Sequence, residues 1–362
     1  MVAKAGLDRR QILKLGTAAC AAALSAPAIV RAHEVLKVAF VYYGSIGDYG
    51  WTYAHELARR SIVAEFGDAI ETTFVENVPE NETAERVMRE LAQRGNQLIF
   101  ATSFGFMRQT VKVAQQFPEV KFEHATGFQR LENLATYNLR FYQGRAVTGT
   151  LAAHMSQTGL AGYVASFPIP EVIMGINAFT LAAQRVNPKF MTRVVWTNNW
   201  FNPERETVVA QRLIDQGADI IAQHTDSPAV LKVAEAAGVY GFGQGADMSE
   251  FAPNAHLTAI VHNWAPYYAK RVRAVQDGTW RAGDHWSGLG DGTLQIAPFN
   301  RNIPRNPRNA AETVRDDIIE GVLDPFAGPI NDQIGIEHEP PGGTLSDEQL
   351  LSMDWFVEGV QT

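Results

Sequence analysis

Cysteine is almost absent from this sequence. Cys20 is the only cysteine among the 362 residues, and it lies within the first 32 residues, which we predict to be removed. A chain that begins after Ala32 has no thiol, so it cannot form a disulfide even in an oxidising compartment. The same absence excludes a cysteine nucleophile.

Two further absences limit the partners of the chain. After residue 32, no apolar run reaches the 18 residues that suggest a membrane-spanning helix. Positive charge is also scarce, with 31 Lys and Arg against 39 Asp and Glu. The first 32 residues hold five Lys or Arg and one Asp, so 26 basic and 38 acidic residues remain after them, a net charge of −12. This acidity argues against a nucleic-acid partner.

The motifs of several enzyme classes are missing as well. The sequence contains no G-x-x-x-x-G-K-S/T, no H-x-x-x-H and no G-x-S-x-G. Gly44, Gly47 and Gly50 have the spacing G-x-x-G-x-x-G, which differs from the dinucleotide fingerprint G-x-G-x-x-G. His224 and Asp226 could serve a metal or acid–base role, but hydrogen bonding is the simpler interpretation. We therefore expect no enzyme, no metal and no other cofactor.

The first 32 residues resemble a twin-arginine export signal. Arg9 and Arg10 precede an Ala-rich apolar run to Ile29, and Ala32 ends a short segment suited to signal peptidase. The alternative is an uncleaved N-terminal anchor. Lipid attachment at Cys20 is disfavoured because Thr17 stands where Leu is usual. The sequence thus predicts a periplasmic protein.

The stretch from Leu36 to Trp51 organises the chain that follows it. The apolar residues Val38–Tyr43 predict a buried strand, and three glycines within the next seven residues predict a turn. From Thr52 the apolar residues recur at helical spacing. A strand, a glycine-rich turn and a helix form the first half of a βαβ unit.

The alternation of strands and helices continues through the chain and restarts once. It predicts an α/β fold with two doubly wound, Rossmann-like lobes and a ligand cleft between them. We expect lobe 1 at residues 33–158, with a return segment near 259–290. Lobe 2 is expected at residues 159–258, with a C-terminal return segment near 291–362. Ligands of such sheets bind beyond the carboxyl ends of the strands.

The loops at the predicted strand ends are rich in aromatic, amide and carboxylate side chains. Aromatic rings can hold a flat ligand by stacking, and polar groups can read its hydrogen-bonding edge. The alternative is that rings such as Phe104 and Phe201 only pack under loops, and that Trp51 only staples the core. The residues in these loops are Asp48, Tyr49, Trp51, Phe104, Phe106, Asn198, Trp200, Phe201, Asn202, His224, Asp226 and Asp247.

Three segments together resemble one family. Residues 213–223, LIDQGADIIAQ, are similar to the motif LxxQGADVIxx. Residues 141–153, FYQGRAVTGTLAA, are similar to a segment ending in EGAYLAGYLAA, and residues 121–125, KFEHA, match the strand after PDVKF. The chain from Val35 to about Leu294 therefore resembles the basic membrane protein (BMP, PnrA-like) family of ABC-transporter substrate-binding proteins, which includes purine nucleoside receptors.

This resemblance implies a type I periplasmic binding protein fold with three hinge crossings. It also implies a purine stacked between two aromatic rings. Trp51 stands at the Phe of the family's SFN motif, and Trp200 at the Phe of its FxDP segment, with Asn202-Pro203 as the DP. The implied partners are a purine ligand and an inner-membrane permease, and the protein is expected to be a monomer.

The sequence departs from the family where a sugar is often held. Gly245 replaces one Asp of the GVDxDQ motif, so that only Asp247 remains. His262 stands at a Lys position and Thr126 at an acid position. These losses favour a free purine base such as adenine. A purine nucleoside, a ligand-sensing role and, less favoured, a nucleoside-processing enzyme stay open. The predicted ligand-binding residues are Trp51, Trp200, Tyr49, Asp48, Phe104, Asn202, His224, Asp226 and Asp247.

Overall fold

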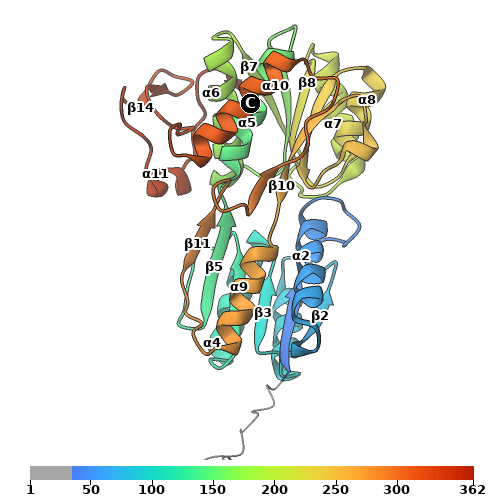
Figure 1. Cartoon of the computed structure of the whole chain (residues 1–362), viewed down its shortest axis with the longest axis vertical. Helices are drawn as coiled ribbons and strands as arrows, with labels where there is room; N and C mark the ends of the chain where they lie inside the picture. The colour runs from blue at the N-terminus through green and yellow to red at the C-terminus, as the bar shows by residue number, and fades with distance from the viewer. Residues whose placement is uncertain (1–34) are drawn as a thin grey trace, which may run out of the picture. The chain divides into compact units, whose positions relative to one another are not determined.

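The computed structural model describes residues 35–362, so the predicted twin-arginine signal and Cys20 lie outside the described residues. Within the described chain, strands and helices alternate to build two large sheets (Figure 1). No helix of residues 35–362 is both long and apolar enough to cross a membrane.

The first sheet has six parallel strands in the order β2-β1-β3-β4-β5-β11. Its helices include α2, α3, α4 and α9. The bounds of these elements are β1 Leu36–Val41, α2 Trp51–Phe66, β2 Ile70–Val75, α3 Glu82–Gln93, β3 Leu98–Ala101, α4 Met107–Gln116, β4 Lys121–Ala125, β5 Leu134–Leu139, α9 Ala265–Gln276 and β11 Asp284–Ser287.

The second sheet has seven strands in the order β15-β7-β6-β8-β9-β10-β12, of which only β12 is antiparallel to its neighbour. A small hairpin, β13–β14, follows α10. The bounds are α5 Phe141–Met155, β6 Leu160–Ala165, α6 Pro170–Val186, β7 Met191–Trp196, α7 Pro203–Asp215, β8 Ile220–His224, α8 Ala229–Ala237, β9 Tyr240–Gly245, β10 His256–His262, β12 Leu294–Ile296, α10 Arg305–Ile319, β13 Ile330–Asn331, β14 Glu337–Glu339, α11 Asp347–Leu351 and β15 Val360–Gln361.

Strand β1 shows why the sequence forms a sheet covered on both faces. Val38 and Phe40 belong to one hydrophobic core, while Ala39 and Val41 belong to another. Successive side chains of a strand point to opposite faces, so a continuous apolar run is buried only when helices cover both faces. The predicted α/β class with two doubly wound lobes is confirmed.

The chain crosses between the two sheets three times, after β5, after β10 and between β11 and β12. The first crossing lies near Arg140, whereas the predicted boundary between the lobes is residue 158. Helix α5 packs on α6 and so belongs with the second sheet. Gly149 allows this packing, because an added Cβ would lie 2.1 Å from the carbonyl oxygen of Phe179. The second crossing follows His262 rather than residue 258, because β10 pairs with β9 up to Val261.

Candidate functional site

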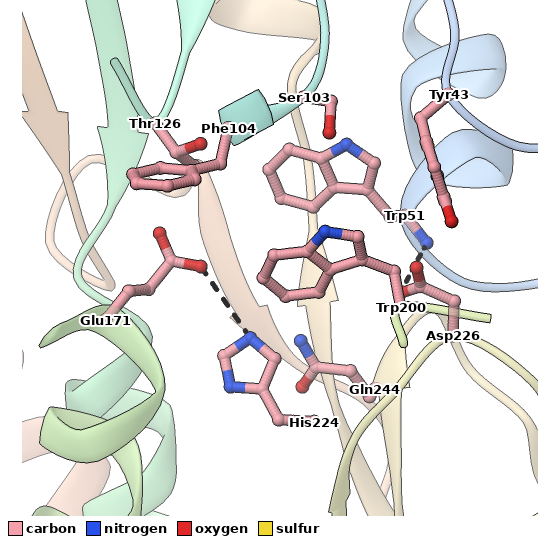
Figure 2. A pocket seen from close by; sticks show the side chains of 10 residues that line it. All are labelled: Tyr43, Trp51, Ser103, Phe104, Thr126, Glu171, Trp200, His224, Asp226 and Gln244. Carbon is pink, nitrogen blue, oxygen red and sulfur yellow. Dashed lines mark hydrogen bonds and ion pairs between the residues drawn. The ribbon is translucent and has the colours of Figure 1, made fainter. Parts of the chain in front are cut away.

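The carboxyl ends of both sets of strands converge on one cavity, whose empty volume, including the part open to solvent, is about 400 Å³. Figure 2 shows its side chains arriving from both sheets. From the first sheet and its helices come Tyr43, Trp51, Ser103, Phe104 and Thr126. From the second come Glu171, Trp200, His224, Asp226 and Gln244.

Two tryptophans face this cavity from opposite sheets (Figure 2). Trp51 is the first residue of α2, and its indole Nε1 donates a 2.6 Å hydrogen bond to the carbonyl oxygen of Thr102. Its ring also packs edge-on against Trp264, with 5.6 Å between centroids. Trp200 lies in the loop after β7 and contacts the ring of Phe167 at 5.1 Å. Both rings are partly buried against the same hydrophobic core, and the ring of Trp51 is fixed in addition by its Nε1 hydrogen bond.

The two lobes are in contact at the N-terminus of α2. The backbone N–H of Trp51 donates to Oδ1 of Asp226 at 3.3 Å, and so links the first sheet to the second. Gly50 and Gly245 bring their backbones together, since a Cβ on Gly245 would lie 2.8 Å from the carbonyl carbon of Gly50. The structure therefore represents a closed arrangement, in which the two lobes are in contact beside the cavity.

The acidic groups of the cavity are hard to ionise. Burial raises the pKa of Glu171 to about 7, although Asn138 Nδ2 donates a 3.0 Å hydrogen bond to its carboxyl group. Burial, together with the nearby carboxylates of Asp48 and Glu206, raises the pKa of Asp226 well above its usual range. Each carboxyl can accept a hydrogen bond when ionised and donate one when protonated.

The histidine beside Glu171 is neutral. His224 Nε2 lies 3.7 Å from Oε1 of Glu171, which is close enough for an ion pair. Burial, followed by the positive charge of Arg145, nevertheless lowers the pKa of His224 well below its usual range. With a neutral imidazole and a carboxyl near half-ionisation at pH 7, this contact is better described as a pair of polar groups that a ligand can bridge.

The raised pKa of Glu171 predicts a pH-dependent stability. Between the ordinary pKa of 4.5 and the raised value of about 7, the folded protein holds a proton that the unfolded chain has lost. The free energy of unfolding therefore falls as the pH rises through this interval, by about 2–4 kcal/mol for this group. Glu171→Gln is expected to remove this decline. Denaturant unfolding from pH 4.5 to 8 measures it.

The control for this experiment is Glu90→Gln, which changes an exposed carboxylate of α3. It should leave the pH profile as in the wild type. The buried carboxyl of Asp226 also has a raised pKa. Its contribution to the pH dependence of the free energy of unfolding is therefore expected in the wild type and in both variants. If wild type and Glu171→Gln have parallel profiles, Glu171 does not hold the proton.

Five of the nine predicted ligand-binding residues line the cavity: Trp51, Phe104, Trp200, His224 and Asp226. Two of the other four cap helices. Asp48 accepts from the backbone N–H groups of Gly50, Thr52 and Tyr53, at 2.9–3.1 Å, at the start of α2. Asn202 accepts from the N–H of Arg205 at the start of α7.

The remaining two predicted residues lie outside the cavity as well. Tyr49 packs edge-on against the ring of Phe251, with 4.7 Å between centroids. Asp247 accepts from the backbone N–H of Ser249 at 2.9 Å and lies beside His256. Both are in strand-end loops, but their side chains contact other parts of the protein rather than the cavity.

Five cavity residues were absent from the predicted set: Tyr43, Ser103, Thr126, Glu171 and Gln244. Four of them lie at or next to strand ends, so the rule that selected Trp51 could have found them. Thr126 also has a positive φ of 58°, which is unusual for a β-branched residue. Glu171 had no such signal, because it reaches the cavity from the first turn of α6.

Within residues 35–362, no cluster of His, Cys, Asp and Glu is arranged to hold a metal ion. The cavity instead combines four aromatic side chains, two carboxyl groups, a neutral imidazole and an amide. Rings can stack on a planar ligand, and the polar groups can satisfy both donors and acceptors at its edge. This combination suits reversible binding of a small, flat, polar molecule.

Known proteins resemble this chain over most of its length. The family model described as "ABC transporter substrate-binding protein PnrA-like" matches residues 35–322. A purine-binding protein of Brucella abortus is 51% identical over 330 residues, covering 91% of this chain and 94% of that protein. A putative ABC transporter glucose-binding protein of Haloferax volcanii is 35% identical over 329 residues, covering 91% and 81% of the two chains.

Solved structures show the same fold. An ABC transporter solute-binding protein from Aeropyrum pernix matches with a TM-score of 0.71 at 18% identity, covering 81% of this chain and 94% of that chain. A second, from Conexibacter woesei, matches with a TM-score of 0.64 at 19% identity, covering 80% and 98%. These likenesses show the fold, and the family resemblance of the sequence is confirmed by the family model.

Proposed function

Because the chain belongs to the PnrA-like family of ABC transporter substrate-binding proteins, we propose that it binds a free purine base, adenine or a close analogue, in the cavity between its two sheets. The observation that carries the proposal is the pair of tryptophans that face this cavity from opposite sheets. Stacking between aromatic rings suits a planar base. The purine-binding relative of Brucella abortus at 51% identity supports the same ligand class.

The choice of a base over a nucleoside rests on the loop after β9. Asp247 turns away from the cavity to accept from Ser249, and Gly245 packs against the backbone of Gly50. Neither Asp247 nor Gly245 therefore has a side chain that can bind ribose hydroxyls in the cavity. The carboxyl groups of Asp226 and Glu171 remain in the cavity, where a carboxyl oxygen can accept from an exocyclic amine whether the group is ionised or protonated. An amine-bearing base such as adenine meets this requirement.

Isothermal titration calorimetry with adenine, guanine, hypoxanthine, adenosine and glucose tests this function. We expect adenine to bind most tightly. Adenosine binding far more tightly than adenine would favour the nucleoside alternative. Glucose binding, with no purine binding, would contradict the proposal and favour the ligand named for the Haloferax volcanii relative. Release of a base from adenosine during incubation would instead indicate a nucleoside-processing enzyme.

Substrate-binding proteins of ABC transporters work with membrane permeases, and the family is one of binding proteins rather than enzymes. We propose that this chain is a monomer without catalytic activity that delivers its base to an inner-membrane permease. A ligand-sensing role would use the same closed cavity. Transport assays in cells that lack this protein separate the two roles, because only the transport role predicts a loss of purine uptake.

Proteins of this family act outside the cytoplasm, and we propose that this one reaches the periplasm through its twin arginines. Replacing Arg9 and Arg10 by lysine should leave the precursor in the cytoplasm, because the export pathway reads this pair. Immunoblots of periplasmic and cytoplasmic fractions measure the result. Unchanged periplasmic protein would reject this route.

A further inference from the structure

Gln244, on β9, lines the cavity with a side chain that is 1% exposed. Its amide has two partners. Nη2 of Arg145 donates to its Oε1 at 2.5 Å, and its own Nε2 lies 3.3 Å from Nε2 of His262. Both partners are themselves buried, so the amide is held from two sides.

Arg145 determines which way this amide faces. Arg145 lies in α5, is fully buried, and also donates to the carbonyl oxygen of Gln223 at 2.7 Å. A guanidinium group has only N–H donors, so the atom of Gln244 that faces it must be the oxygen. The reversed amide would oppose N–H to N–H, and the two hydrogens that face each other would have no acceptor in a buried site.

His262 accepts the first amide hydrogen of Gln244. Burial, followed by the positive charge of Arg145, lowers the pKa of His262 to about 3, so its imidazole is neutral at pH 7. Because the amide nitrogen of Gln244 only donates, Nε2 of His262 must be the acceptor. An amide nitrogen carries two hydrogens, and among residues 35–362 the second has no acceptor. Figure 2 shows this nitrogen on the side of the Trp200 ring.

We propose that Gln244 is a specificity-determining residue that presents a fixed N–H donor to a ring nitrogen of the purine, and that Arg145 is the positioning residue that fixes it. This inference rests on the purine-binding function proposed above. Asp226 and Glu171 can accept from the ligand, whereas Gln244 donates to it. The cavity therefore selects a ligand that combines hydrogen-bond donors with a lone pair on an unsubstituted ring nitrogen.

Calorimetry with adenine and its 1-deaza, 3-deaza and 7-deaza analogues tests the proposal, because each analogue lacks one acceptor nitrogen. The wild type is expected to bind one of the three about tenfold more weakly than adenine, as the loss of one buried hydrogen bond implies. Gln244→Met keeps the length of the side chain without its donor. It should bind adenine about tenfold more weakly and should no longer distinguish that analogue from adenine.

Three further variants separate an effect on ligand specificity from an effect on folding. Gln223→Met changes another fully buried glutamine, on the neighbouring strand β8 and outside the cavity, so it should keep the discrimination of the wild type. Arg145→Met should reduce the discrimination although Gln244 is present. Arg145→Lys retains a buried donor and should restore part of it, which a merely structural role for Arg145 does not predict.

The outcomes distinguish this inference from the proposed function. If the wild type binds no purine, both are overturned. If it binds adenine but treats the three deaza analogues alike, or if Gln244→Met discriminates as the wild type does, the inference alone is overturned. The inference about Gln244 is supported if Gln244→Met no longer distinguishes adenine from the deaza analogue and Gln223→Met still does.

Discussion

Trp200→Ala is expected to weaken the binding of adenine by about 5- to 150-fold. The loss corresponds to the roughly 1–3 kcal/mol that stacking on one aromatic ring contributes per base. Trp200 lines the cavity near the rings of Phe167 and His224 and is only partly buried, so we expect its removal to affect the ligand site more than the stability. Calorimetric titration of the variant with adenine measures the effect.

Trp51→Ala should weaken binding similarly but lower the stability as well. Its ring packs against Trp264 and its Nε1 donates to Thr102, and the removal of a large packed side chain commonly costs about 3–5 kcal/mol. Trp355→Ala is the matched control for Trp200, because this tryptophan stacks on His338 in the C-terminal segment, away from the cavity. Affinity equal to the wild type in both Trp51→Ala and Trp200→Ala would contradict a purine held between two rings.

Gly50→Ala is expected to weaken ligand binding by about tenfold or more, because it opposes closure of the two lobes. An added Cβ at this position would lie 2.4 Å from the carbonyl oxygen of Asp226 in the facing lobe. Both atoms are fixed to backbone, so the contact is relieved only by moving the lobes apart, and overpacking of this kind costs about 1–3 kcal/mol. Calorimetry with adenine measures the affinity.

Small-angle scattering gives a second measure of the same effect. The wild type is expected to contract when adenine binds, as hinged two-lobed proteins do. Gly50→Ala should keep a larger radius of gyration at saturating adenine. Gly47→Ala is the control in the same loop, because the nearest atom to its added Cβ is Oγ of Ser45 at 3.8 Å. Equal radii and equal affinities in the two variants would exclude the proposed role of Gly50.

Much of the fold follows from short-range sequence patterns. The apolar run Val38–Tyr43 had to be a strand buried on both faces, because alternate residues enter two different cores. The strand–helix alternation then required parallel sheets, and parallel sheets place their loops at one edge. This reasoning was sufficient to select Trp51, Phe104, Trp200, His224 and Asp226 before the cavity was known.

Side-chain direction within those loops could not be predicted in the same way. Asp48 and Asn202 lie at strand ends, as the cavity residues do, yet each turns back to cap the helix that follows it. An exposed helix start offers free N–H groups only a few residues away. Whether a short polar side chain caps its own helix or points across a cleft depends on backbone angles that the residue sequence does not specify.

The sequence by itself determined the two α/β units, the strand-end location of the cavity and its aromatic character, since these depend on local periodicity and chain direction. Only the tertiary structure decided that α5 packs with the second sheet, that Glu171 reaches the cavity from α6, and that Arg145 fixes the amide of Gln244. The physical reason is that these are contacts between segments far apart in the chain. Close helix packing at Gly149 and burial of an arginine beside an amide have no periodic signature, and they arise only when the helices and strands of the second lobe pack together.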